Sequence, residues 1–550
     1  MTRFTIGPLS FRLEDGALRD IRWNDVEAIR GIAWLVRAPD WATLPARIRD
    51  LSVRQEADRL RVDFVTETEG LRTTIHIDAR PEGMLRVEGR ALPPADLLVN
   101  RAGFVILHPI EGVAGGWARI VHSDGRAEET RFPDLIAPWQ PFMDLAAITH
   151  RVSGAEVDCE LTGDVFETED QRNWSDASFK TYSRPAALPR PYLLPAGQEV
   201  VQTVTLRFRP GPVLSPSAPA SVEGAVMPQI GLAVAPAEIA STLAHVATLR
   251  QVGPQRILCH FDPTDGHGAA ELRDYARLQS AFPAEYDLEY VAASADDLGA
   301  EMAALAKAVA AAGLRLSSLA VSPAADWWPE ARTRPPLEAV YAAARAAFPG
   351  LPLGGGMFGY FTEFNRTHPP VGLLDHVTHG TNPIVHAADD ESVMQTLETI
   401  PHILRSGRAI VGDRPYRLGP TTIGMRQNPS GSRGVPDPDG RPVCKSGDDP
   451  RQSQPFAAAF TAGYAIAQAG SGVEAWVPAA FSGPRGIIAP DGTLWPVGEV
   501  VAALARMAGR VVAAKGRDWL RLEDGGGIEA RLSAPYGARL TPPPSRTQPK

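Results

Sequence analysis

The sequence predicts a multidomain protein of the all-β and α/β classes: a (β/α)8 TIM-type barrel with an N-terminal β-sandwich and a small C-terminal β element. Three observations support this prediction. Short alternating runs fill residues 1–210, a Pro/Ser/Ala stretch occupies residues 211–228, and apolar runs then alternate with Ala/Leu-rich segments. At 550 residues, the chain is also too long for one simple domain.

The first 210 residues predict antiparallel strands. Runs such as LRVDFVTETEG, LRTTIHIDAR and VVQTVTLRFRP alternate apolar and polar residues, which is typical of strands with one buried face. A β-sandwich accommodates many such strands. Residues 211–228 have no hydrophobic period and predict an interdomain linker.

Residues 229–508 predict the barrel, with eight strands and interleaved helices. The expected strands span residues 230–235, 256–261, 286–293, 316–322, 352–357, 376–381, 415–419 and 472–477. The expected helices span residues 237–251, 269–281, 295–312, 337–348, 392–406, 455–469 and 497–507. Residues 408–413 compete for the seventh strand, but the sequence Gly-Asp-Arg-Pro at 412–415 favours a turn there.

The C-terminal region predicts strands within residues 509–540, separated by Gly turns, and we expect them to pack with the sandwich. The Pro-rich tail at residues 541–550 is expected to be disordered.

Bulk composition excludes several classes of partner. The formal net charge of -9 gives no basic footprint for nucleic acid or for an anionic membrane. No secretory signal or membrane span is expected, and three scattered cysteines indicate neither a disulfide framework nor a thiolate metal site. We therefore expect a cytoplasmic protein without a cofactor; its oligomeric state is left open.

The segment from Glu167 to Tyr182 concentrates charged, amide and aromatic side chains in one short stretch. These groups can hold a polyhydroxylated ligand, because they combine hydrogen-bonding groups with a flat apolar ring. The alternative is a solvated loop. The expected substrate-binding residues here are Asp170, Arg172, Asn173 and Trp174.

Polar residues at the predicted strand ends give the candidate catalytic set, because TIM-barrel active sites lie there. Glu363 follows a Gly-rich strand end and is the first candidate for an acid or base, its alternative being a helix-start carboxylate. Asp326 stands beside Trp327 and Trp328, which either bind sugar or pack the barrel mouth. The expected catalytic residues are Glu363, His260, His379 and Asp326, and further expected substrate-binding residues are Asp262, Asn365, Asn382 and Arg426.

A metal site is not expected, since no HExxH-like spacing is present and the histidines serve better as hydrogen-bonding groups. After the seventh strand, residues 427–453 form a long Gly/Pro/polar segment that predicts a lid or binding loop, with disorder as the alternative.

Several long motifs occur in one order along the chain: NRAGFVILHP, HSDG, EDQRNWSDASFKTY, FTEFNR, TNPIVHAADD and GPTTIGMRQNP. Together they resemble the D-apionate lactonase family over both proposed domains. The resemblance implies hydrolysis of a sugar-acid lactone, D-apionolactone to D-apionate, in carbohydrate catabolism. Family membership alone does not fix the substrate.

Lactone opening needs activated water, a stabilised oxyanion and a proton for the leaving alkoxide. Glu363 is the expected base, and His260 or His379 is the expected donor to the oxyanion or the leaving oxygen. Arg172 and Asn173 are expected to hold ring hydroxyls or the developing carboxylate.

Two alternatives stay open at this level. A glycoside hydrolase would use a pair of carboxylates, Asp326 and Glu363. A non-catalytic sugar-binding protein is disfavoured by the number of titratable groups at strand ends.

Overall fold

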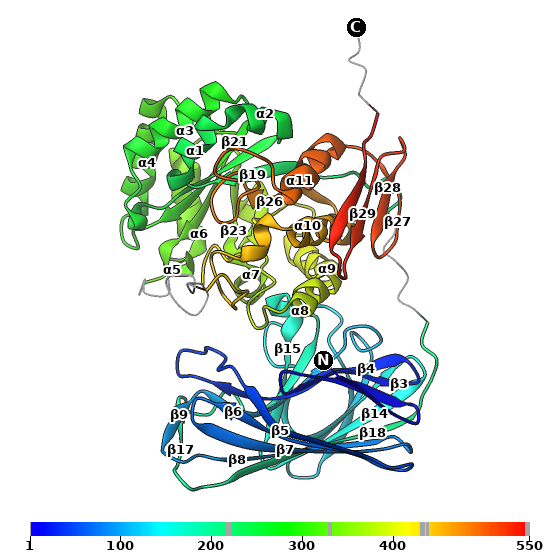
Figure 1. Cartoon of the computed structure of the whole chain (residues 1–550). Helices are drawn as coiled ribbons and strands as arrows, with labels where there is room; N and C mark the ends of the chain where they lie inside the picture. The colour runs from blue at the N-terminus through cyan, green and yellow to red at the C-terminus, as the bar shows by residue number, and fades with distance from the viewer. Residues whose placement is uncertain (1, 216–221, 328–332, 429–434, 436–438, 545–550) are drawn as a thin grey trace. The chain divides into compact units, whose positions relative to one another are not determined.

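The computed structural model describes residues 2–215, 222–327, 333–428, 435 and 439–544. The chain forms two compact units (Figure 1). Unit 1 comprises Met1–Arg172 and Ala177–Ala218, and unit 2 comprises Asn173–Asp176 and Pro219–Lys550. The predicted fold class is confirmed.

Unit 1 contains one large antiparallel sheet in the order β1-β2-β3-β4-β10-β16-β15-β13-β14-β18-β8-β7-β6-β5, with β11 and β12 attached beside β13, and a separate β9-β17 pair. The strands are β1 (Thr2–Ile6), β2 (Leu9–Glu14), β3 (Ala17–Trp23), β4 (Val26–Arg37), β5 (Arg47–Gln55), β6 (Leu60–Thr68), β7 (Leu71–Arg80), β8 (Met84–Leu92), β9 (Leu97–Val99), β10 (Arg101–His108), β11 (Trp117–His122), β12 (Ala127–Arg131), β13 (Phe142–Val152), β14 (Ala155–Thr162), β15 (Phe166–Asp170), β16 (Phe179–Ser183), β17 (Tyr192–Leu194) and β18 (Val200–Pro210).

The large sheet folds over so that distant strands face each other across one hydrophobic core. Trp23 of β3 stacks on Phe208 of β18, with ring centroids 5.6 Å apart. A side chain at Gly89 of β8 would collide with the ring of Trp34 of β4, so glycine permits this close approach. Apolar residues at alternate positions thus build the two layers of a sandwich.

Unit 2 contains the closed parallel barrel β19-β20-β21-β22-β23-β24-β25-β26. Its strands are β19 (Gln229–Val234), β20 (Arg256–Phe261), β21 (Glu285–Ala292), β22 (Ser318–Pro323), β23 (Leu353–Tyr360), β24 (His376–Gly380), β25 (Tyr416–Leu418) and β26 (Val473–Ala480). Each of the eight predicted strands is confirmed with small shifts in its ends, because strands buried on both faces read as apolar runs.

The helices of unit 2 surround the barrel strands (Figure 1). They are α1 (Ile239–Ala244), α2 (Val246–Val252), α3 (Ala269–Ala281), α4 (Leu298–Ala312), α5 (Ala324–Trp327), α6 (Leu337–Ala347), α7 (Phe361–Thr367), α8 (Asp390–Gln395), α9 (Ile400–Val411), α10 (Pro455–Gln468) and α11 (Pro496–Met507). Residues 408–411 end α9, so the competing assignment of the seventh strand is excluded. The first predicted helix is divided at His245 into α1 and α2.

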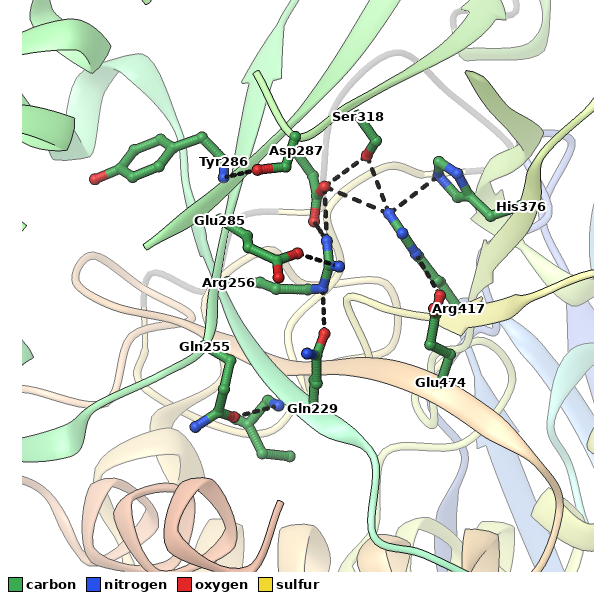
Figure 2. A network of polar contacts seen from close by, with 12 residues as sticks. Gln229, Gln255, Arg256, Glu285, Tyr286, Asp287, Ser318, His376, Arg417 and Glu474 are labelled. Carbon is green, nitrogen blue, oxygen red and sulfur yellow. Dashed lines mark hydrogen bonds and ion pairs between the residues drawn. The ribbon is translucent and has the colours of Figure 1, made fainter. Parts of the chain in front are cut away.

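A buried polar layer lies inside the barrel toward the amino-terminal ends of its strands (Figure 2). Arg256 Nη1 lies 2.7 Å from Asp287 Oδ2, and Arg417 Nη1 donates to Ser318 Oγ at 3.0 Å. Arg417 Nη1 also lies 3.4 Å from His376 Nε2, and burial lowers the pKa of His376 to about 3. Since this end of a TIM barrel serves stability, we assign the layer a structural role.

The C-terminal strands β27 (Val512–Lys515), β28 (Trp519–Leu522), β29 (Gly527–Arg531) and β30 (Gly537–Thr541) form a separate antiparallel sheet. We expected this element to pack with the sandwich, but it belongs to unit 2 and packs on α10. Phe456 of α10 meets Tyr536 with ring centroids 4.8 Å apart, and Lys515 Nζ donates to Ala469 O at the end of α10 at 2.6 Å. This lysine complements the carbonyl end of the helix, which explains the packing.

Residues 216–221 of the predicted linker and 545–550 of the predicted tail lie outside the described residues. Within the described ranges, every helix is too short or too polar to span a bilayer.

Candidate active site

Three side chains meet where strands of the barrel end: His260 of β20, Glu289 of β21 and Arg426 from the loop after β25. Arg426 Nη2 lies 2.5 Å from Glu289 Oε2 and 3.2 Å from His260 Nδ1. Its guanidinium carbon lies 5.0 Å from the ring centroid of Trp327. Arg426 Nη1 is buried and has no hydrogen-bond partner in the described part of the chain, so this donor is available to a ligand.

The charges of this group follow from its partners. Burial raises the pKa of Glu289, but the guanidinium of Arg426 and a hydrogen bond from His260 outweigh burial and hold it below its ordinary value. Burial lowers the pKa of His260. At neutral pH the structure therefore favours an ionised Glu289 beside a neutral His260.

Glu363 lies in the first turn of α7, directly after β23, and is partly buried. Burial raises its pKa from 4.5 to about 7, while Arg366 lowers it and Asp326 raises it further. A carboxyl group that exchanges its proton near neutral pH suits acid or base catalysis.

Tyr360 connects Glu363 with the loop that carries Arg426. It precedes α7, and its hydroxyl donates to the carbonyl of Gln427. Burial raises the pKa of this hydroxyl, and Arg426 and Glu363 both act on it electrostatically. The two candidate groups therefore belong to one mouth of the barrel.

The short segment Asn173–Asp176 belongs to unit 2, although the residues on both sides belong to unit 1. Asn173 contacts α7 twice: its Oδ1 accepts from Asn365 Nδ2 at 3.0 Å, and its carbonyl accepts from Thr362 Oγ1 at 2.7 Å. The predicted residue Asn173 thus contacts the predicted residue Asn365 of α7, the helix that carries Glu363.

Trp174, the next residue, stands beside two side chains of unit 2. The Arg366 guanidinium carbon lies 5.3 Å from the Trp174 ring, and the His386 ring lies 5.7 Å from it. His386 Nδ1 in turn lies 2.6 Å from Asp176 Oδ2. The arrangement places an aromatic face and polar groups next to α7.

Asp170 and Arg172, in contrast, form an enclosed ion pair in unit 1. Arg172 Nε lies 2.8 Å from Asp170 Oδ1, Arg172 Nη2 lies 2.7 Å from Asp170 Oδ2, and both side chains are 0% exposed. Arg172 also donates to Pro133 O, and Asp170 accepts from Ala137 N. These contacts give the pair a structural role in place of the expected contact with substrate.

His379 was expected to act on substrate, but it is fully buried. Its Nδ1 lies 2.9 Å from Gly380 O and its Nε2 lies 2.5 Å from Tyr416 Oη, so both ring nitrogens are occupied. Burial lowers the pKa of His379 to about 4. The ring packs against Phe361, Phe364 and Tyr416.

Two further predicted residues stabilise loops. Asp262 is fully buried, and its Oδ1 accepts from Thr264 N at 2.8 Å, which caps the turn after β20. Asn382 Nδ2 donates to the carbonyls of Thr422 and Ile423 at 3.1 and 2.9 Å. Asn382 thereby holds the loop that carries Arg426.

Asp326 lies in α5, directly after β22, and is held by Arg334 through contacts of 2.5 and 3.0 Å. Its neighbour Trp327 lies 5.0 Å from the His260 ring and so lines the mouth, whereas Trp328 lies outside the described residues. A bidentate partner leaves Asp326 poorly placed as a second catalytic acid.

Sequence reasoning did not identify Glu289. Its signal was present, because Glu285, Asp287 and Glu289 alternate within an otherwise apolar strand and therefore point to the same side. Of the loop at residues 427–453, residues 429–434 and 436–438 lie outside the described residues. In the ranges that the structure describes, no three His, Cys, Asp or Glu side chains gather as a metal site.

A closed parallel barrel with a carboxylate, an arginine and a histidine at its strand ends defines this chain as a TIM-barrel protein with an enzyme-like site. Family models described as "D-apionate lactonase, N-terminal domain" and "D-apionate lactonase, TIM barrel domain" match residues 1–211 and 230–509. The D-apionate lactonase of Brucella anthropi is 42% identical, with 95% of this chain and 89% of the relative covered. The chain belongs to the D-apionate lactonase family, and the resemblance found in its motifs is confirmed.

Solved structures show only distant likeness. A family 39 glycoside hydrolase from Bacteroides cellulosilyticus WH2 is 11% identical at a TM-score of 0.37, with 79% of this chain and 86% of that chain covered. A β-glucuronidase from Ruminococcus gnavus is 11% identical at a TM-score of 0.33, with 84% of this chain and 68% of that chain covered. A galactose 1-epimerase from Lactobacillus acidophilus NCFM is 9% identical at a TM-score of 0.27, with 38% of this chain and 93% of that chain covered. Such scores do not discriminate between functions.

Proposed function

We propose that this protein hydrolyses a sugar-acid lactone, D-apionolactone to D-apionate or a close relative. Membership of the lactonase family supports this reaction. The observation that carries it to particular residues is the carboxyl group of Glu363, whose pKa burial raises to about 7 at the end of β23.

In the proposed reaction, ionised Glu363 takes a proton from water as the water oxygen attacks the lactone carbonyl carbon. The resulting tetrahedral oxyanion accepts a hydrogen bond from the unpartnered Nη1 of Arg426. When the ring C–O bond breaks, Glu363 returns its proton to the leaving alkoxide, which gives the hydroxy acid.

The other mouth residues position these groups and the substrate. Glu289 holds Arg426 through Nη2, and Nη1 has no partner among the described residues. His260 is proposed as a second polar contact for the substrate. Trp327 and Trp174 supply flat faces for sugar C–H groups, and Asn365 is proposed to bind a hydroxyl. From the expected catalytic set the proposal keeps Glu363 and His260 and leaves out His379, which is buried, and Asp326, which is paired with Arg334.

The glycosidase alternative requires a second free carboxyl group across the cleft. Its expected partner, Asp326, is committed to Arg334, so we do not extend the proposal to glycosides. We propose a cytoplasmic location and a small-molecule lactone as the partner, and we expect no nucleic-acid or membrane partner.

The test compares acid release from a panel of aldonolactones with cleavage of chromogenic glycosides, each with and without chelator. Acid release from lactones alone supports the proposal, and cleavage of glycosides alone refutes it. Loss of the activity on chelation would require a metal in the mechanism.

A further inference from the structure

A second group of charged side chains lies in unit 1, on the face of β4, β10, β15 and β16 that points away from the hydrophobic core. Ala102, Phe104 and Ile106 of β10 point into the core, so Arg101 points to the opposite face. Arg37 pairs with Arg101 in register, and Tyr182 and Lys180 lie on the same face of β16.

Arg101 is 6% exposed and forms no direct ion pair among the described residues; it interacts with the Tyr182 hydroxyl and, at longer range, with Glu167 and Glu169. Its guanidinium carbon lies 3.7 Å from the ring centroid of Tyr182 and 5.9 Å from that of Trp41. Aromatic rings contact the flat faces of a guanidinium, whereas its N–H groups point outward in the plane. The in-plane edge of Arg101 therefore has no carboxylate in direct contact, a contact that a largely buried arginine favours.

The nearby carboxylates do not supply that anion. Glu169 Oε2 lies 2.6 Å from Lys180 Nζ. Glu167 Oε1 accepts from the hydroxyl of Tyr182 and from Ala186 N. Each acid is engaged by another donor.

Three cations lie close together in this group. Burial lowers the pKa of Lys180, and Arg101 and Arg37 lower it further, so the three cations repel one another. Glu167 and Glu169 lie near these cations. A further anion would reduce the repulsion among the cations.

Two more arginines extend the group. The guanidinium carbon of Arg190 lies 5.0 Å from the ring centroid of Trp41, which also contacts Arg101. Arg184 lies 4.2 Å from the Tyr192 ring, and its Nε is buried without a partner in the described structure. Arginines stacked on aromatic rings present in-plane donors that suit a planar anion beside an apolar surface.

We propose that Arg101, with Arg184 and Arg190, forms a second, non-catalytic binding site for a carboxylate anion of the sugar-acid class. The choice of a sugar acid rests on the proposed function, because a lactone hydrolase releases one. The proposal of an anion rests on Arg101, which has no carboxylate in direct contact.

The test is calorimetric titration of the full chain with D-ribonate and, separately, with sulfate. We compare the unmodified protein with Arg101→Gln and with Arg72→Gln, a control arginine on β7 whose side chain is 63% exposed. Loss of a bidentate charge-assisted contact should weaken binding at this site about tenfold or more in Arg101→Gln only. Lactone turnover at saturating substrate should stay unchanged in both variants.

Weakening for both anions supports the site and the ligand class. Weakening for sulfate alone overturns the sugar-acid class, and equal binding by Arg101→Gln and the unmodified protein overturns the site. Should Arg101→Gln fail to fold by circular dichroism, the exposed Arg190→Gln takes its place, with about threefold weakening expected and unchanged binding refuting the site. Failure of the proposed function would show separately, as absent lactone hydrolysis by the unmodified protein.

Discussion

Replacing Glu363 by Gln should stabilise the protein at alkaline pH and remove its activity. Gln has the shape of the protonated acid but cannot ionise. Burial raises the pKa of Glu363 from 4.5 to about 7, so the native state keeps a proton that the unfolded chain has already released. Stability of the unmodified protein therefore falls as pH rises from about 4.5 to 7, and the loss is complete above 7.

The pKa difference of about 2.5 corresponds to about 3 kcal/mol, at about 1.4 kcal/mol per pKa unit. The free energy of unfolding of Glu363→Gln, relative to that of the unmodified protein, should thus be up to about 3 kcal/mol higher at pH 8 than at pH 4. At the same time kcat/KM on the cognate lactone should fall by about 10²–10⁴-fold, the usual contribution of a general base.

The assays are urea unfolding at several pH values and initial rates of acid release. As the base, Glu363 should also make kcat/KM of the unmodified enzyme rise with pH up to about 7 and level off above it. Glu338→Gln, an exposed change on α6, is the control and should alter neither property. Normal kcat/KM in Glu363→Gln, or no gain in stability at pH 8, would refute this reasoning.

Three further changes test the remaining assignments. Arg426→Met should lower kcat about 10²-fold or more, because the oxyanion loses its hydrogen-bond donor. The exposed control Arg414→Met should keep the kcat of the unmodified protein. An unchanged kcat in Arg426→Met would remove Arg426 from the mechanism. Asp326→Asn should reduce lactone hydrolysis less than about tenfold, since its carboxylate serves Arg334, and a larger loss would restore it as a catalytic group. Asp170→Asn should lower the free energy of unfolding by about 3–5 kcal/mol, because the fully buried Arg172 loses its carboxylate partner, and Tm should fall by about 10 °C. The exposed control Asp58→Asn should leave Tm unchanged. An unchanged KM of Asp170→Asn supports this structural role, and a raised KM would restore Asp170 as a substrate-binding residue.

The barrel could be predicted because its strands are short apolar runs separated by helix-length segments, and this rhythm is local. Even the seventh strand could be assigned, since the turn at residues 412–415 ends α9 before β25 begins. The position of the C-terminal sheet was wrong for the opposite reason. Packing on α10 depends on Phe456 and Lys515 meeting partners distant in sequence, which no local pattern contains.

For the site, the sequence by itself determined which residues follow the barrel strands, and Glu363 and Arg426 were predicted as candidates in this way. The tertiary structure decided which of them are enclosed: His379 is fully buried, and Asp170 is buried against Arg172, both indistinguishable in the sequence from ligand-binding groups. It also revealed Glu289 as the carboxylate that holds Arg426. The physical reason is that charge and hydrogen-bonding capacity belong to a residue, whereas burial and partners arise only when distant segments pack together.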